Sequence, residues 1–80
     1  MTEAEKILAE ELKFDLEDES SAAYYENIVK EYQHQFLRET KMKALLADNV
    51  RNRGAYFNKL VQINGKKHRT RRSGQEQIEY

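Results

Sequence analysis

The chain has 80 residues, which allows one small domain. It contains no Cys, which excludes disulfides, thiolate metal sites and cysteine nucleophiles, and no apolar run reaches the roughly 18–20 residues of a membrane span. The 14 basic and 14 acidic residues cancel, but residues 1–40 hold 11 acids and 4 bases whereas residues 41–80 hold 10 bases and 3 acids. The chain is therefore bipolar, with a net charge of −7 in its first half and +7 in its second half.

Helix-favouring residues dominate the composition. Pro is absent and Gly occurs only 3 times, which is unusual for a chain rich in β-strands or linkers. Leu, Ile, Val and Phe together account for 17 of the 80 residues, which is enough for a small core but little for a deep enzyme cleft. We therefore expect an all-α domain of three to four short helices.

The first predicted helix covers residues 3–13. Thr2 and Glu5 form a capping-box pattern, in which each side chain accepts a hydrogen bond from the backbone amide of the other residue. Apolar residues follow at helical spacing, namely Ala4, Leu8 and Leu12. A connector over residues 14–21 is expected next, with Phe14 and Leu16 as its apolar anchors and Ser20 or Ser21 as the cap of the following helix.

The second predicted helix covers residues 22–39 and is the central packing element. Its apolar residues fall on one helical face, namely Tyr25, Ile28, Val29, Tyr32 and Phe36. The next apolar residues, Met42, Leu45 and Leu46, would lie on the opposite side of a continued helix. A bend over residues 38–41, followed by a short helix to residue 47, would bring them back to the core.

The last predicted helix starts at Asn52, a suitable cap after the polar turn over residues 48–52. Its apolar residues are Ala55, Tyr56, Phe57, Leu60, Val61 and Ile63. Asn64 and Gly65 are a typical helix stop, because Gly adopts the left-handed conformation that often follows a helix. We therefore expect the helical domain to cover residues 1–65.

Residues 66–80 form a predicted basic C-terminal arm. The arm carries five permanent cations and no apolar anchor among its first nine residues, so we expect it to be disordered in the free protein. Runs of Lys and Arg neutralise nucleic-acid phosphates and release counterions. The cations of this arm are Lys66, Lys67, Arg69, Arg71 and Arg72.

Residues 41–63 have the outline of a helix-turn-helix unit. Arg51, Arg53 and Lys59 would extend the positive surface of the arm, and Asn58 and Gln62 are residue types that read adenine. The same outline is also typical of two helices that only pack together. The resulting hypothesis is a small accessory or regulatory protein that binds nucleic acid, DNA in preference to RNA, through the arm and the last helix.

An acidic surface supports a different hypothesis. It would contain Glu10, Glu11, Asp15, Glu17, Asp18 and Glu19. Such a surface fits a basic protein partner, so the alternative is a protein–protein adaptor or inhibitor, with a homodimer formed by pairing of opposite charges as one variant.

No catalytic set is present in the sequence. It lacks a nucleophile–base pair and a Gly-rich phosphate loop, so we expect a protein that is not an enzyme and has no cofactor. Glu31 and His34 have the spacing of half a di-iron motif, but a single copy predicts no metal site. Without Cys, a signal sequence or a membrane span, we expect a cytoplasmic protein, or a nuclear one in a eukaryote.

Overall fold

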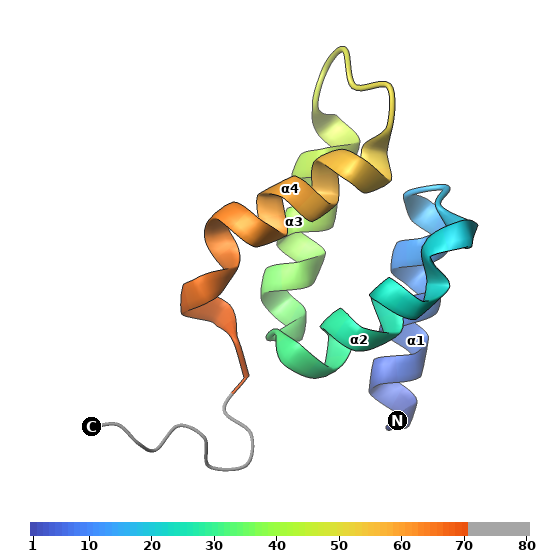
Figure 1. Cartoon of the computed structure of the whole chain (residues 1–80), viewed down its shortest axis with the longest axis vertical. Coiled ribbons are helices and arrows are strands. Elements are labelled where there is room, and N and C mark those ends of the chain that lie inside the picture. The colour runs from blue at the N-terminus through green and yellow to red at the C-terminus, as the bar shows by residue number, and fades with distance from the viewer. Residues whose placement is uncertain (71–80) are drawn as a thin grey trace.

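A computed structural model describes residues 1–70. In order along the chain, its elements are α1 (Glu3–Asp15), the 3-10 turn η1 (Glu19–Ser21), α2 (Ala22–Glu31), α3 (His34–Leu46), α4 (Arg53–Asn64) and the 3-10 turn η2 (Gly65–His68). The all-α class is confirmed, and residues 1–70 form four α-helices. Helix α1 packs mainly against α2, and α3 mainly against α4, so the fold consists of two helical hairpins (Figure 1).

Helix α1 begins at the predicted capping box. The amide of Glu5 donates to Thr2 Oγ1 at 3.1 Å, and the amide of Thr2 donates to Glu5 Oε1 at 3.0 Å. The helix ends at Asp15, two residues later than predicted. Two apolar anchors were expected in the connector. The prediction for Leu16 is confirmed, since its side chain is 2% exposed. The prediction for Phe14 is wrong, because α1 continues past it and places its side chain on the outer side of the helix, 71% exposed.

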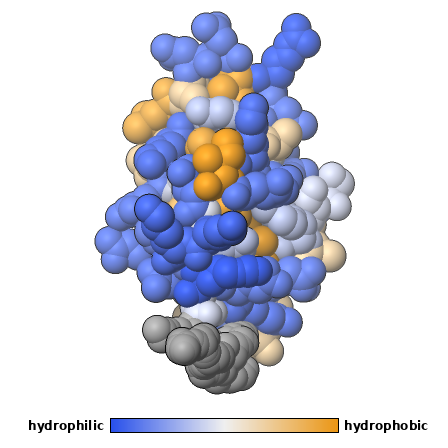
Figure 2. All heavy atoms as spheres, turned by 60° about the vertical axis from the view of Figure 1, so that its left-hand side comes forward, coloured by the Kyte–Doolittle hydropathy of each residue, from blue (hydrophilic) through white to orange (hydrophobic). Residues whose placement is uncertain are grey.

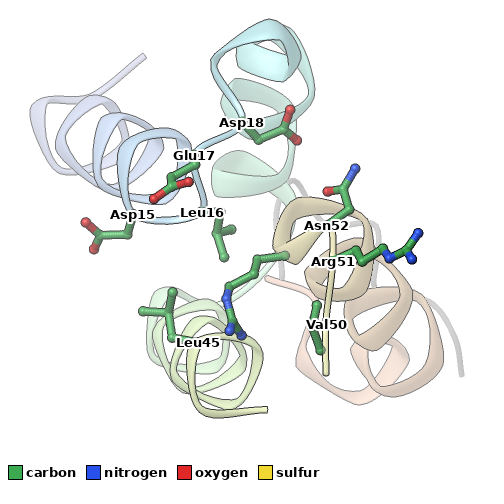
Figure 3. Close-up of a pocket in the computed structure, with 9 residues that line it drawn as sticks. Asp15, Leu16, Glu17, Asp18, Leu45, Val50, Arg51 and Asn52 are labelled. Carbon is green, nitrogen blue, oxygen red and sulfur yellow. The ribbon is translucent and has the colours of Figure 1, made fainter. Parts of the chain in front are cut away.

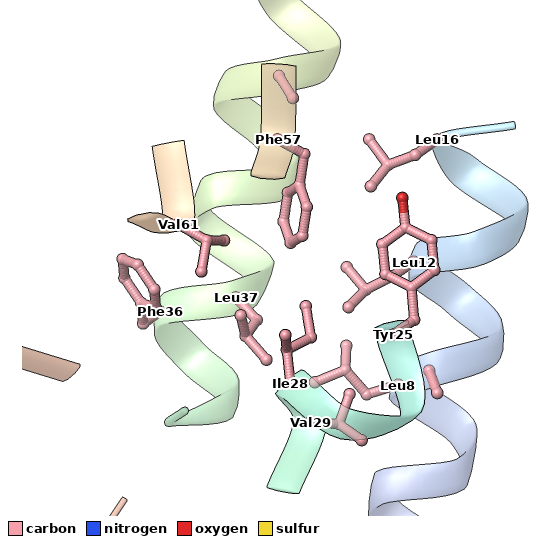
Figure 4. Close-up of a cluster of buried hydrophobic side chains, with 12 residues drawn as sticks. Leu8, Leu12, Leu16, Tyr25, Ile28, Val29, Phe36, Leu37, Phe57 and Val61 are labelled. Atoms are coloured by element: carbon pink, nitrogen blue, oxygen red, sulfur yellow. The ribbon is translucent and has the colours of Figure 1, made fainter. Parts of the chain in front are cut away.

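One hydrophobic core lies between the two hairpins (Figure 4). Tyr25 from α2 and Phe57 from α4 are both fully buried, with their ring centroids 6.1 Å apart. Leu8 and Leu12 enter the core from α1 and Leu16 from the position directly after it, and Leu37 and Val61 enter it from α3 and α4. Since each hairpin supplies one side of this core, neither would bury its apolar face alone.

The predicted helix over residues 22–39 is wrong in its extent. The chain is extended at Tyr32 and Gln33, where ψ is 156° and 138°, so α2 ends at Glu31 and a new helix starts at His34. The bend expected at residues 38–41 is absent, because these residues lie inside α3. The break leaves the carbonyl oxygen of Val29 without a hydrogen bond from the helix backbone. His34 Nε2 lies 2.9 Å from this oxygen and takes the place of the missing amide.

The early break changes which residues of α3 face the core. Leu37 and Ala44 are fully buried, and Thr40 is buried with its hydroxyl donating to the carbonyl of Phe36 at 2.8 Å. Met42 and Leu46 were expected in the core but are 48% and 74% exposed. Both lie on the side of α3 opposite its buried residues, because no bend follows residue 38.

The start of the predicted C-terminal arm is ordered by the break between α2 and α3. The amide of Gln33 donates to the carbonyl of His68 and the amide of Thr70 donates to the carbonyl of Glu31, both at 2.8 Å. The His68 ring stacks on Phe36 with centroids 4.3 Å apart. Residues 66–70 of the predicted arm are therefore held against the break between α2 and α3. The rest of the predicted arm, residues 71–80, lies outside the described residues.

Gly65 differs from its predicted role. Its φ of −76° and ψ of −22° are right-handed, so it continues the helical path into η2 and does not adopt the left-handed conformation. The reason for Gly is close packing, since a Cβ atom there would lie 2.6 Å from Cε1 of Tyr32. The ring of Tyr32 thus rests directly on the backbone where α4 becomes η2.

Polar side chains on α1 and α3 bridge the two hairpins. Lys41 Nζ lies 2.7 Å from Glu11 Oε2 and 2.8 Å from Asp15 Oδ2, and Arg38 Nη2 lies 3.3 Å from Glu11 Oε1. Burial acts to lower the pKa of Lys41, but its hydrogen bonds to and charge attraction with Asp15 and Glu11 outweigh this effect and raise it. The ammonium group therefore stays charged and holds α1 beside α3.

Candidate nucleic-acid interface

Helix α4 and the turn after it present a continuous exposed ridge. Asn52 caps the helix as predicted, because its Oδ1 accepts from the amide of Ala55 at 2.9 Å. Phe57 and Val61 point into the core, so the opposite side of α4 faces the solvent. We call this exposed side the α4–η2 ridge, formed by Lys59, Gln62, Ile63, Lys66 and Lys67.

The ridge lies in a stretch of chain without negative charge. Residues 51–70 contain six Lys or Arg residues, and residues 49–75 contain no Asp or Glu. Among the ion pairs of residues 1–70, none involves Arg51, Lys59, Lys66 or Lys67. The face at the left of Figure 1 is accordingly mainly hydrophilic, with only small separate apolar patches (Figure 2). These four cations are thus available to a negatively charged partner.

Arg53, which was expected in the interface, has a different position. Its Nη1 donates to the carbonyls of Ala44 and Ala47, the latter at 3.2 Å, so the guanidinium caps the C-terminal end of α3. The side chain is partly buried under the loop between α3 and α4. The sequence gives only a weak signal for this contact, because Arg53 lies six residues after Ala47 and nine after Ala44, beyond the spacing of neighbours within one helix.

Arg69 is also engaged but remains accessible. Its Nη2 lies 3.7 Å from Glu31 Oε1, and its guanidinium carbon lies 5.2 Å from the centre of the Tyr32 ring. Half of its side-chain surface remains exposed, so a phosphate could still approach it. Arg71 and Arg72 belong to the part of the chain that the structure does not describe.

The two residues expected to read bases are held by neighbours. Asn58 is partly buried, and its Oδ1 accepts hydrogen bonds from Tyr24 Oη at 2.5 Å and from Gln62 Nε2 at 3.2 Å. Burial, with smaller effects of Tyr32 and Glu31, raises the pKa of Tyr24 to about 12. The phenol therefore remains a hydrogen-bond donor at neutral pH and keeps the amide of Asn58 from turning outward.

Several of the acidic residues predicted to bind a partner have partners within the fold. Glu11 and Asp15 bind Lys41, and Glu10 lies 3.4 Å from Lys13. Asp18 accepts from Tyr25 Oη at 3.0 Å and from Ser20 Oγ at 3.4 Å. Its carboxylate also packs against Gly54, where a Cβ atom would lie 2.5 Å from Asp18 Oδ2. Glu17 and Glu19 remain exposed.

A cleft of about 370 Å³ separates the end of α1 from the loop before α4. Leu16 points into it, whereas the charged ends of Asp15 and Arg51 point away from it on opposite sides (Figure 3). The charged ends of Asp15 and Arg51 therefore do not converge on a common point, as ligand-binding groups do around a small molecule.

The predicted half of a di-iron motif makes other contacts. Glu31 pairs with Arg69, and His34 contacts the carbonyl of Val29. Within residues 1–70, no three His, Cys, Asp or Glu residues are placed together to hold a metal ion.

None of the helices in residues 1–70 is both long enough and apolar enough to cross a bilayer. The chain matches no protein-family model, no curated protein and no solved structure. The residues and their geometry are therefore the basis for any functional conclusion.

Proposed function

We propose that this chain is a small accessory or regulatory protein, without enzymatic activity, that binds nucleic acid through the phosphate backbone, DNA in preference to RNA. The observation that carries the proposal is the α4–η2 ridge, which presents exposed cations on a stretch without a single acid. Lys59 and Lys66 are seven residues apart along a nearly continuous helix, so both lie on the same side. Such a side can lie along a groove or a strand of phosphates.

The same geometry favours binding without base readout. Lys is a phosphate ligand that acts as a flexible point charge, whereas base readout depends on fixed bidentate groups. The one Arg at the start of α4, Arg53, is turned inward to α3, and Asn58 is held by Tyr24. Binding should therefore depend strongly on salt and weakly on nucleotide sequence.

The fixed start of the C-terminal arm adds to this surface. Hydrogen bonds from Gln33 and Thr70 hold residues 68–70 against the end of α2, directly after the ridge. Arg69, half of whose side-chain surface is exposed, is thereby held at a defined position after the ridge and adds a further phosphate ligand.

Salt dependence tests the proposal. With about five phosphates neutralised, a plot of log K against log salt on duplex DNA should have a slope of about −4 to −5. Fluorescence anisotropy with short labelled duplexes of two unrelated sequences, and with RNA of the same sequences, measures the slope and the preference. A flat slope, or no binding at low salt, would contradict the proposal.

A matched pair of variants locates the interface. The triple variant Lys59→Gln, Lys66→Gln and Lys67→Gln should weaken binding and reduce the slope by about 2 to 3, because each lost phosphate contact removes about 0.9. The control replaces three other exposed lysines that lie outside the ridge, namely Lys6, Lys30 and Lys43. Both variants lose three positive charges, so equal losses of affinity would show that only net charge matters and that the ridge is not the interface.

A further inference from the structure

The outer side of α1 carries a second regular pattern that nucleic-acid binding does not use. Glu3, Ile7, Glu10 and Phe14 follow one another at spacings of four, three and four residues, so they lie on one side of the helix. We call them the α1 stripe. Ile7 is 54% exposed and Phe14 is 71% exposed, on the side opposite the buried Leu8 and Leu12. Two large apolar side chains thus alternate with two acids on a solvent-facing surface.

Symmetric pairing of two α1 helices would be unfavourable. Antiparallel contact would place Glu3 opposite Phe14 and Glu10 opposite Ile7 of the other copy, so that each carboxylate would be covered by an apolar side chain without a cationic partner. A surface complementary to the α1 stripe would have an apolar side chain at the matching position and cations in place of the two glutamates. Such a surface exists on this chain.

The α4–η2 ridge has this complementary pattern. Lys59, Ile63 and Lys66 are spaced by four and three residues, and Ile63 is 64% exposed. Seven residues of helix span about 10.5 Å, so Lys59 and Lys66 are separated by the same distance as Glu3 and Glu10. With Ile63 against Ile7, each lysine would face one glutamate, and Phe14 would lie about 10.5 Å further along the contact. The match of Glu3, Ile7 and Glu10 with Lys59, Ile63 and Lys66 holds in charge, in the position of the apolar residue and in spacing.

We propose that the α1 stripe of one molecule docks on the α4–η2 ridge of a second copy of this chain. Helix α1 and the η2 end of α4 lie on opposite flanks of the molecule (Figure 1). The two surfaces are different, so the contact is heterologous and each copy can bind a further one, which gives a ring or a chain of molecules. Contact of one helix with another buries little area, so association is weak and is weakened further by salt.

Sedimentation velocity without nucleic acid tests the proposal independently of the proposed function. At low salt, the mean sedimentation coefficient of the wild type should rise with protein concentration from about 10 µM to about 1 mM, and this rise should disappear at high salt. The double variant Ile7→Ser and Phe14→Ser should remain monomeric over the same range. A wild type that is monomeric at every concentration at low salt would overturn the proposal.

A control separates the α1 stripe from exposed apolar surface in general. Met42 and Leu46 are 48% and 74% exposed on α3, outside both surfaces. The double variant Met42→Ser and Leu46→Ser should associate like the wild type. Equal loss of association in both double variants would overturn the assignment to α1.

Charge reversal provides a test that a folding defect cannot imitate. One variant carries Glu3→Lys and Glu10→Lys, and the other carries Lys59→Glu and Lys66→Glu. Each should be monomeric alone, because its two surfaces then repel. An equimolar mixture restores opposite charges between the variants, so it should associate, with circular dichroism confirming that both are folded. Failure of the mixture to associate would contradict pairing between these surfaces.

Discussion

At the scale of single residues, one unfavourable backbone conformation ends α1. The amide of Glu17 donates to the carbonyl of Phe14 at 3.1 Å, and the amide of Asp18 donates to the carbonyl of Lys13 at 3.0 Å. These two bonds form a Schellman motif, which requires a left-handed residue between helix and loop. Here that residue is Glu17, with a φ of 54°, although Gly is the usual choice. The side chain of Glu17 is exposed and has no described hydrogen-bond partner in compensation.

Glu17→Gly should therefore stabilise the protein. The left-handed conformation costs a residue with a Cβ about 1–2 kcal/mol, and part of the gain is offset by the greater freedom of Gly in the unfolded chain. We expect a net gain of about 0.5–1 kcal/mol and a rise in Tm of a few degrees, measured by thermal unfolding. Glu19→Gly is the control, because Glu19 begins η1 and Gly should not stabilise it. A Tm that falls with Glu17→Gly would contradict this explanation.

At the scale of elements, the division between α2 and α3 depends on a segment distant in sequence. Tyr32 forms a β-bridge with Arg69, the amide of Gln33 donates to the carbonyl of His68, and the amide of Thr70 donates to the carbonyl of Glu31. The Gln33 amide and the Glu31 carbonyl would bond within a continuous helix, but here they find partners in the C-terminal segment. The stacking of His68 on Phe36 and the packing of Tyr32 on Gly65 close this contact.

His68→Ala should loosen this contact without unfolding the core. Loss of the stacked ring should cost about 1 kcal/mol. Hydrogen exchange at the amides of Gln33 and Thr70 should accelerate, because both donate across the contact. Lys67→Ala, at an exposed neighbouring position, should leave both amides protected. Unchanged exchange in His68→Ala would show that the backbone bonds alone hold the segment.

At the scale of the whole molecule, charge is sorted into regions. Residues 1–31 hold ten acids and three bases, whereas residues 51–70 hold six bases and no acid. Between these regions, Lys41 and Arg38 of α3 neutralise Glu11 and Asp15 of α1, so part of the acidic half stabilises the fold internally. Both proposals use the α4–η2 ridge, and the second also uses the opposite charge of the α1 stripe.

Contact between the hairpins should weaken in acid. Burial acts to raise the pKa of Glu11, but hydrogen bonds to and charge attraction with Lys41 and Arg38 outweigh burial and lower the pKa below its usual value. A lowered folded-state pKa gives stability that is present above the unfolded value and is lost as the pH falls through the folded value. Glu11→Gln should therefore cost about 0.5–1 kcal/mol at pH 7 and make stability less dependent on pH below about 5.

Urea unfolding between about pH 2 and 7 measures this effect. Glu10→Gln is the control, because Glu10 pairs only with Lys13 on its own helix and is largely exposed. If Glu11→Gln and the wild type lost equal stability between pH 5 and 2, the contribution of the Glu11–Lys41 contact would be contradicted.

The sequence by itself determined the features that depend on near neighbours. The all-α class, the capping box at Thr2, the cap at Asn52 and the buried face of α2 follow from spacing and local hydrogen bonding. The bipolar charge and most cations of the candidate interface also follow directly from the residue order.

Only the tertiary structure decided features that depend on distant partners. Pairing of residues 68–70 with residues 31–33 divides the predicted long helix, and the new start of α3 places Met42 and Leu46 in solvent. Arg53 was predicted to bind nucleic acid but caps α3, because folding brings open carbonyls within its reach. Backbone groups and charges take the partners that the fold places beside them, and helical periodicity contains no information about those partners.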